Sequence, residues 1–283
     1  MPMQRSTFTS PVDGLELATY EWNISDPRGV VQVAHGLAEH SARYDRFARA
    51  LNDAGYAVRA TDHRGHGASI VGKPGDFGAP GFEALIADVA AYGASVHGDL
   101  PLFLLAHSMG SFAAQSVILT HSQQYAGVVL SGTTALDVLA AGMAQAEGPV
   151  GLEAFNAGFE HRTGYEWLTR DEAEVDHYVA DPLCGFDLPD ETVPALFGAA
   201  GTLADPTALA SIRSDLPLLV VSGSEDPLAG GGQLVEVLGQ RYRDAGLVDV
   251  TVKLYDGARH EILNEINRDE VTTDVLAWLD AHL

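Results

Sequence analysis

Apolar and polar positions follow two alternating patterns along most of the chain. Short runs that are apolar at nearly every position are separated by longer stretches in which apolar residues recur every three to four positions. Strands are predicted at residues 30–34, 56–61, 102–106 and 127–130, helices at 41–54, 82–96 and 109–120, and a hairpin across 7–22. Ser41 is the expected N-cap of the first helix. Continuous apolar runs are typical of parallel strands buried on both faces, so this order predicts an α/β fold with a mainly parallel sheet and helices on both faces.

The alternation stops after residue 132 and resumes at residue 216. Residues 133–215 contain short helical pieces between Gly and Pro residues and no clear strand. A segment of this length is too long for an ordinary loop, so we predict a helical cap inserted between a first core part, 1–132, and a second core part, 216–283. In the second part, strands are predicted at 216–222 and 249–255, and helices at 233–244 and from about residue 269.

A candidate nucleophile lies between the strand at 102–106 and the helix that follows it. Residues 106–110 read Ala-His-Ser-Met-Gly, with a small residue two positions before and two positions after Ser108. A sharp strand–turn–helix needs small residues at these two positions, and the turn lifts the serine hydroxyl above the sheet. The amide of Met109, at the helix start, is then a candidate donor to the substrate oxygen.

A serine hydroxyl needs a base to take its proton, and the base needs an orienting acid. Asp226 follows the predicted strand at 216–222, and His260 follows the strand at 249–255. The chain order Ser108, Asp226, His260 is that of the α/β-hydrolase triad, so we predict these roles for the three residues. Glu225 is the competing acid, but consecutive residues leaving a strand point in different directions, which favours Asp226.

A second oxyanion donor is expected from the loop after the strand at 30–34. The amide of Leu37 is assigned to it, and His35 is expected to brace the loop rather than to react. His63 and His66 have an H-x-x-H spacing, but no cysteine or carboxylate joins them at a known ligand spacing, so no metal site is predicted. His107 is expected to pack beside the serine.

Charge and cysteine content narrow the classes of partner. The formal net charge of −23 disfavours binding to nucleic acid, because phosphate backbones would be repelled. No apolar run is long enough to cross a membrane, and the first residues lack a secretory signal. The single cysteine, Cys184, cannot form an internal disulfide, so a reducing compartment and a cytoplasmic location are expected.

Several motifs together resemble a known family. They are His-Gly-Leu-Ala-Glu-His at 35–40, Arg-Tyr at 43–44, Asp-His-Arg-Gly-His-Gly-Ala-Ser at 62–69, the serine motif at 106–110 and Arg-His-Glu at 259–261. In this order they resemble the monoacylglycerol lipase and lysophospholipase branch of the α/β-hydrolases, the serine aminopeptidase-like hydrolases. The resemblance covers about residues 10–283, although the cap matches loosely, chiefly at 181–184.

This resemblance implies the α/β-hydrolase fold, the triad Ser108, Asp226 and His260, and the oxyanion donors Leu37 and Met109. It also implies no cofactor, and an apolar acyl channel beneath a cap that can touch membranes or micelles. Ala106 and Ser111 depart from the family pattern, which usually has glycine at both positions, but neither blocks the turn.

The function predicted from the sequence is hydrolysis of carboxylic esters, such as monoacylglycerols or similar lipid monoesters, through an acyl-enzyme. Two alternatives keep the same triad: an esterase for small alkyl or aryl esters, and an amide or peptide hydrolase. A non-catalytic binding protein is the remote alternative, and a complete triad argues against it. The substrate is a small-molecule ester in each enzymatic reading. The acyl length and the leaving alcohol stay open at this level.

Overall fold

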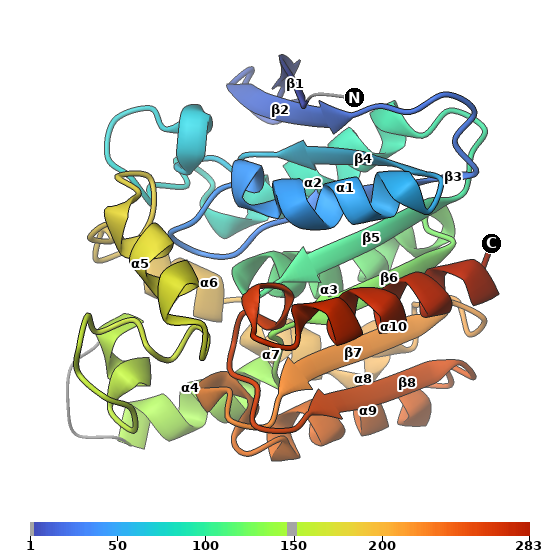
Figure 1. Ribbon diagram of the computed structural model, residues 1–283. Coiled ribbons are helices and arrows are strands. Elements are labelled where there is room, and N and C mark those ends of the chain that lie inside the picture. The colour runs from blue at the N-terminus through green and yellow to red at the C-terminus, as the bar shows by residue number, and fades with distance from the viewer. Residues whose placement is uncertain (1–2, 146–151) are drawn as a thin grey trace.

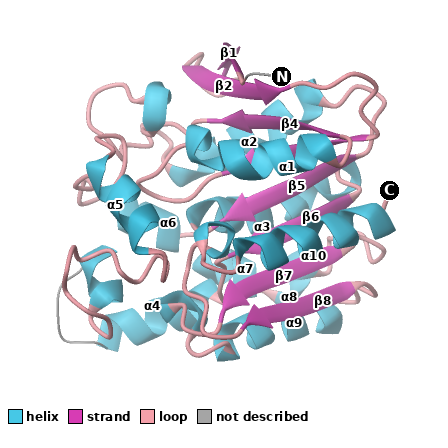
Figure 2. Ribbon diagram, in the orientation of Figure 1, coloured by secondary structure: helices cyan, strands magenta, loops and turns pink. Residues whose placement is uncertain are grey.

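The apolar runs along the chain all enter one eight-stranded sheet. The computed structural model describes residues 3–145 and 152–283. Its strands are β1 (Gln4–Thr9), β2 (Glu16–Trp22), β3 (Gly29–Ala34), β4 (Tyr56–Thr61), β5 (Leu102–His107), β6 (Gly127–Ser131), β7 (Leu218–Gly223) and β8 (Val250–Tyr255). Their spatial order is β1-β2-β4-β3-β5-β6-β7-β8. Figure 2 shows the sheet from β1 at one edge to β8 at the other. The predicted hairpin β1–β2 is antiparallel and joins β4 antiparallel, whereas β4 to β8 run parallel, as the continuous apolar runs predicted.

Helices cover both faces of this sheet, and each face has its own apolar core. One face carries α1 (Asp45–Asp53) and α10 (Arg268–Ala281), and the other carries α2 (Phe82–Val96), α3 (Met109–His121) and α9 (Gln233–Asp244) (Figure 1). Burying an apolar stripe on each face is what holds such layers together. The side chains of Val271, Val275, Trp278 and Leu279 in α10 are all buried.

The segment between β6 and β7 is helical. It contains α4 (Leu136–Gln145), α5 (Glu172–Ala180), α6 (Thr192–Phe197), α7 (Ala200–Ala204) and α8 (Pro206–Leu209), and no strand among its described residues. Figure 1 shows α4, α5 and α6 beyond the carboxyl ends of the parallel strands, where ligands bind in open α/β sheets. The division at 1–132, 133–215 and 216–283 stays a prediction. Among the described helices, none is both long and apolar enough to cross a membrane.

The expected role of Ser41 was wrong. A 3-10 turn occupies Ser41–Tyr44, and α1 begins only at Asp45, so Ser41 does not cap the helix. The amide of Ser41 donates instead to Oδ1 of the buried Asp62, at 2.8 Å. This distant carboxylate draws the backbone into a tighter turn than local pattern alone would suggest. Further 3-10 turns occur at Gly67–Ser69, Ser122–Gln124, Leu152–Asn156, Pro227–Ala229 and Ile262–Asn264.

Candidate active site

Ser108 lies on the sharp turn between β5 and α3. Its backbone has φ 52° and ψ −122°, a conformation that residues with a Cβ rarely adopt. A Cβ at Gly110 would lie 2.3 Å from the carbonyl oxygen of Ala34, so only glycine lets α3 approach β3 this closely. The small residue that the motif predicted two positions after Ser108 is therefore required by the packing of the turn. Strained backbone of this kind is often found where a side chain must be presented to a ligand.

Asp226 and His260 form a buried pair beyond β7 and β8. Nδ1 of His260 lies 2.9 Å from Oδ2 of Asp226. The carboxylate also accepts hydrogen bonds from the Ser222 hydroxyl at 2.8 Å and from the Leu228 amide at 2.9 Å. Glu225 is exposed and does not bond to the histidine. The structure thus pairs the predicted acid, and not its neighbour, with the predicted base.

Two opposing effects set the protonation of this pair. Burial alone would raise the pKa of Asp226, but the His260 charge and three hydrogen bonds lower it below its ordinary value. For His260, burial would lower the pKa, but the adjacent Asp226 carboxylate outweighs burial and raises it. The pair therefore favours an ionised aspartate beside a histidine that binds a proton more readily than in water.

Among residues 3–145 and 152–283, no hydrogen bond joins Ser108 to His260, and the two are related through residues that lie beside both. The ring of Trp167 contacts the His260 ring, with centroids 4.8 Å apart, and lines the same pocket as Ser108. The ring of His107, the residue before Ser108, also contacts the His260 ring, with centroids 4.7 Å apart. Such hydrogen bonds are often long or open in enzymes without substrate.

The two predicted oxyanion donors are amides that bond to no other group in the described chain. Leu37 lies in the turn after β3, and Met109 begins α3; both line the pocket that holds Ser108. The turn is tied down at both sides of Leu37. The Gly36 amide donates to Oε1 of Glu39 at 2.5 Å, and the Ala38 carbonyl accepts from the Tyr178 hydroxyl at 2.8 Å. A preorganised pair of donors is what an oxyanion requires.

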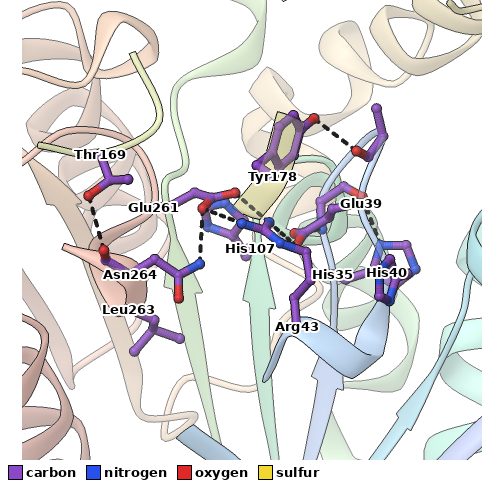
Figure 3. Close-up of polar contacts among 12 residues, drawn as sticks. His35, Glu39, His40, Arg43, His107, Thr169, Tyr178, Glu261, Leu263 and Asn264 are labelled. Atoms are coloured by element: carbon purple, nitrogen blue, oxygen red, sulfur yellow. Dashed lines mark hydrogen bonds and ion pairs between the residues drawn. The ribbon is translucent and has the colours of Figure 1, made fainter. Parts of the chain in front are cut away.

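Glu39, Arg43 and Glu261 form a buried ionic cluster (Figure 3). Arg43 donates two hydrogen bonds to Glu261, at 2.6 and 2.7 Å, and one to Glu39, at 2.8 Å. Glu39 holds the Leu37 turn, and Glu261 directly follows His260, so Arg43 connects the Leu37 turn with the loop that carries His260. Burial would raise the pKa of Glu261, but Arg43 brings it to about 2.

The sequence motifs contained these three residues without indicating their contact. Glu39 and Arg43 have the i,i+4 spacing of a helical ion pair, which is a local signal. Glu261 is 218 positions from Arg43, and only the fold brings it close. The cluster borders a separate cavity of about 360 Å³, which His107 also lines.

Two other histidines near the site, His35 and His107, make structural contacts and have lowered pKa values. His35 accepts at Nε2 from the His63 amide at 2.9 Å, so it braces the loop as expected. Burial and the neighbouring His63 and His66 lower its pKa well below the ordinary value. Burial and the His260 charge lower the pKa of His107 to about 4, which leaves it uncharged at neutral pH. Neutral, buried rings suit packing rather than proton transfer.

An apolar pocket of about 560 Å³, counted together with its opening to solvent, lies over Ser108. Core and cap contribute to it together: Leu37, Ser108, Met109, Phe112 and Leu228 from the core, and Leu139, Met143, Leu152, Phe155, Trp167, Val193, Leu196 and Phe197 from residues 133–215. None of these described lining residues is charged. The sequence could not tell which cap aromatics face the site; Phe155, Trp167 and Phe197 do.

One group of side chains has the donor types for a metal ion. His40, Asp181 and Cys184 offer ligand atoms within 4.8 Å of one another. His40 Nε2 already pairs with Asp181 Oδ2 at 2.9 Å, which ties the core to the cap. Burial raises the pKa of the Cys184 thiol, which disfavours the thiolate that a metal needs. Cys184 does not line the apolar pocket.

Comparison with known proteins decides the family. The family model described as serine aminopeptidase, S33, matches residues 25–267, which include the serine turn, the cap and the Asp226–His260 pair. The chain belongs to the serine aminopeptidase S33 family. The resemblance noted in the sequence motifs is thereby confirmed, as is the α/β-hydrolase fold.

Three relatives in or near this family cover almost the whole chain. The chain is 32% identical to a monoacylglycerol lipase of Mycolicibacterium smegmatis, over 96% of this chain and 95% of that protein. It is 30% identical to a monoglyceride lipase of Mus musculus, over 98% and 89% of the two chains. The crystal structure of a thermostable carboxyl esterase from Bacillus coagulans, in complex with glycerol, superposes with a TM-score of 0.85 at 28% identity and 99% coverage of both chains.

Membership of the S33 family and these esterase and lipase relatives identify the chain as a serine hydrolase. The prediction that it is an enzyme is confirmed, and the reading as a non-catalytic binding protein is set aside.

Proposed function

We propose that this enzyme hydrolyses monoacylglycerols or similar lipid monoesters through an acyl-enzyme intermediate. One observation carries the proposal: an uncharged, apolar pocket of about 560 Å³ opens over Ser108. An acyl chain buried there removes apolar surface from water, worth about 0.8 kcal/mol for each methylene group. The monoacylglycerol lipases of M. smegmatis and mouse, which match over nearly the full length, support the same substrate class.

The Asp226–His260 pair, the turn at Ser108 and the family of the chain support the following roles for the site residues. Ser108 Oγ attacks the ester carbonyl, and His260 takes its proton while Asp226, at 2.9 Å, holds the ring and balances the imidazolium. The amides of Leu37 and Met109 stabilise the oxyanion. His260 then protonates the leaving alcohol, and a water activated by the same ring releases the fatty acid. These steps balance with water as the only co-reactant, so no cofactor or metal is proposed.

The pocket lining favours an acyl chain over an amino-acyl group. An aminopeptidase must hold the ammonium of its substrate, usually with a carboxylate. The described lining of the pocket has no acidic residue, and the nearby carboxylates of Glu39 and Glu261 are both engaged by Arg43. Peptide hydrolysis is therefore the less favoured alternative on this triad.

A panel of p-nitrophenyl esters with two to sixteen carbons, run beside a 1-monoacylglycerol, lysophosphatidylcholine and an aminoacyl anilide, tests the proposal. We expect the highest kcat/KM at about eight carbons or more, because longer chains fill more of the pocket, and glycerol release from the monoacylglycerol. A maximum at two to four carbons would move the enzyme to small esters. Cleavage of the anilide alone would move it to peptide hydrolysis.

We also propose that the cap contacts lipid aggregates and that the protein is cytoplasmic. Val138, Val179 and Leu183 of the 133–215 segment are exposed, which gives the cap apolar groups for an aggregate surface. The single, buried Cys184 fits a reducing compartment.

A further inference from the structure

The candidate base His260 is held largely by the cap. The amide of His260 donates to the Trp167 carbonyl at 3.3 Å, and the amide of Glu261 donates to the Leu168 carbonyl at 2.7 Å. Arg259 donates to the carbonyls of Glu166, at 2.7 Å, and Thr169, at 3.2 Å. Residues 166–169 thus run beside the loop 259–261 and bond to each of its residues.

Trp167 adds a side-chain contact to these backbone bonds. Its ring lies 4.8 Å from the His260 ring at an interplanar angle of 38°, and both side chains are almost wholly buried. Asp226 holds the Nδ1 edge of the imidazole, and Trp167 and His107 limit its remaining freedom to turn. In the described chain the indole Nε1 has no hydrogen-bond partner. Trp167 therefore acts on His260 through its ring face and its carbonyl rather than through its N–H.

We propose that Trp167 is a positioning residue, whose indole face and carbonyl align His260 toward Ser108. His260 is then aligned only when the 166–169 segment is packed against the 259–261 loop. The inference rests on the proposed role of His260, but not on the identity of the lipid substrate. Trp167 also lines the pocket, so a positioning role must be distinguished from the role of a pocket wall. A wall residue would affect long acyl chains only, whereas a positioning residue affects every ester.

The test compares Trp167→Leu, Trp167→Phe and the parent enzyme on p-nitrophenyl acetate, whose acyl group is too short to fill the pocket. We expect kcat on the acetate to fall roughly tenfold in Trp167→Leu with KM nearly unchanged, the size expected from loss of one aromatic contact. Trp167→Phe keeps a ring and should stay within about threefold of the parent. Phe186→Leu is the matched control, because Phe186 is a cap aromatic that touches neither the pocket nor His260.

A parental kcat on the acetate in Trp167→Leu, with a raised KM only for long-chain esters, would overturn the proposal and leave Trp167 as a wall. Because turnover of the acetate needs the catalytic residues but not a filled acyl pocket, this result is separate from monoacylglycerol turnover, which reports on the proposed substrate.

A second measurement uses the folded parent chain and does not depend on a Trp167 variant. A protonated imidazole quenches the fluorescence of a contacting indole. Tryptophan emission should therefore decrease as the pH is lowered and His260 binds a proton, with the same midpoint as the activity profile. The titratable groups around His260 are Asp226, His107, Glu39 and Glu261. We expect this transition to vanish in His260→Gln and to persist in His282→Gln, which removes the second indole–imidazole contact, at Trp278. An unchanged transition in His260→Gln would overturn the ring contact.

Discussion

Replacing Arg43 by methionine removes the cation of the buried cluster behind the site. The guanidinium donates three hydrogen bonds to Glu39 and Glu261, and the three side chains are 12%, 4% and 5% exposed. Methionine fills a similar volume but leaves two carboxylates buried without a counter-ion. The substitution therefore tests whether the cluster stabilises the fold or only accompanies it.

The expected loss follows from Glu261. Its pKa is held at about 2, below the ordinary 4.5, which corresponds to about 3 kcal/mol of native-state stability at neutral pH. Breaking a buried ion pair by removing one partner costs about 3–5 kcal/mol, in agreement with that figure. For a domain of this size we expect Tm to fall by about 6–12 °C at about pH 8.

The lowered pKa of Glu261 also determines how the destabilisation by Arg43→Met changes with pH. A carboxyl group with a depressed pKa stabilises the fold above its unfolded pKa, and this contribution disappears as the pH falls through its folded pKa. Arg43→Met removes the contribution, so its destabilisation should be full and nearly constant from pH 8 down to about pH 5, and should shrink as the pH falls from about 4.5 toward 2. Scanning fluorimetry at several pH values measures this difference.

Arg49→Met is the matched control, because Arg49 is exposed and pairs only with Asp45 on the surface of α1. Surface ion pairs contribute little, so its Tm should stay at the parental value. An Arg43→Met protein with a Tm shift no larger than that of Arg49→Met, or with the same shift at every pH, would refute the reasoning.

Three further predictions concern the site itself. Asp226→Asn should lower kcat by about 10⁴-fold, because the His260 tautomer is no longer held, whereas Glu225→Gln, at an exposed position, should leave kcat unchanged; equal effects in steady-state assays would contradict the assignment. The value of kcat/KM should fall below a midpoint above pH 6.5, because Asp226 outweighs burial and raises the pKa of His260, which works only when neutral; a pH–rate profile that stays flat to about pH 5 would exclude a histidine base. Gly110→Ala should lower stability by about 1–3 kcal/mol and reduce kcat, because its Cβ would lie 2.3 Å from the Ala34 carbonyl oxygen; parental Tm and kcat would show that the turn tolerates a side chain.

Much of the fold could be predicted because its signals are local. A parallel strand covered on both faces must be apolar at nearly every position, and β5, β6 and β7 are. The buried residues of α10, Val271, Val275, Trp278 and Leu279, recur at helical spacing, which is why a helix could be predicted there. The order of Ser108, Asp226 and His260 relative to predicted strand ends was enough to expect them at one edge of the sheet.

What sequence reasoning missed depends on contacts between distant segments. Ser41 donates its amide to Asp62 instead of capping a helix, and no local pattern shows that bond. The same holds for Arg43 with Glu261, which come from the two separate core parts. It holds also for Trp167 with His260, which are joined only when the cap packs against the core. Phe, Tyr and Trp residues of the cap look alike in the sequence whether or not they face the pocket. Their orientation is decided by packing.

Ser111 shows how a departure from the family pattern is accommodated. Its hydroxyl donates to the Ser108 carbonyl at 2.6 Å and bonds to the Thr133 hydroxyl at 2.8 Å. A glycine at this position could make neither bond. The side chain thus supports the first turn of α3 and links it to the start of the 133–215 segment.

The central claim is that Ser108 is the nucleophile. Reaction of the chain with a long-chain alkyl fluorophosphonate, followed by peptide mass spectrometry and residual turnover of a monoacylglycerol, tests it most directly. We predict one phosphonate per chain, on the peptide that contains Ser108, with activity lost in proportion to labelling and no labelling of a folded Ser108→Ala protein. Labelling of another residue in the parent, or turnover that survives complete labelling of Ser108, would contradict the account.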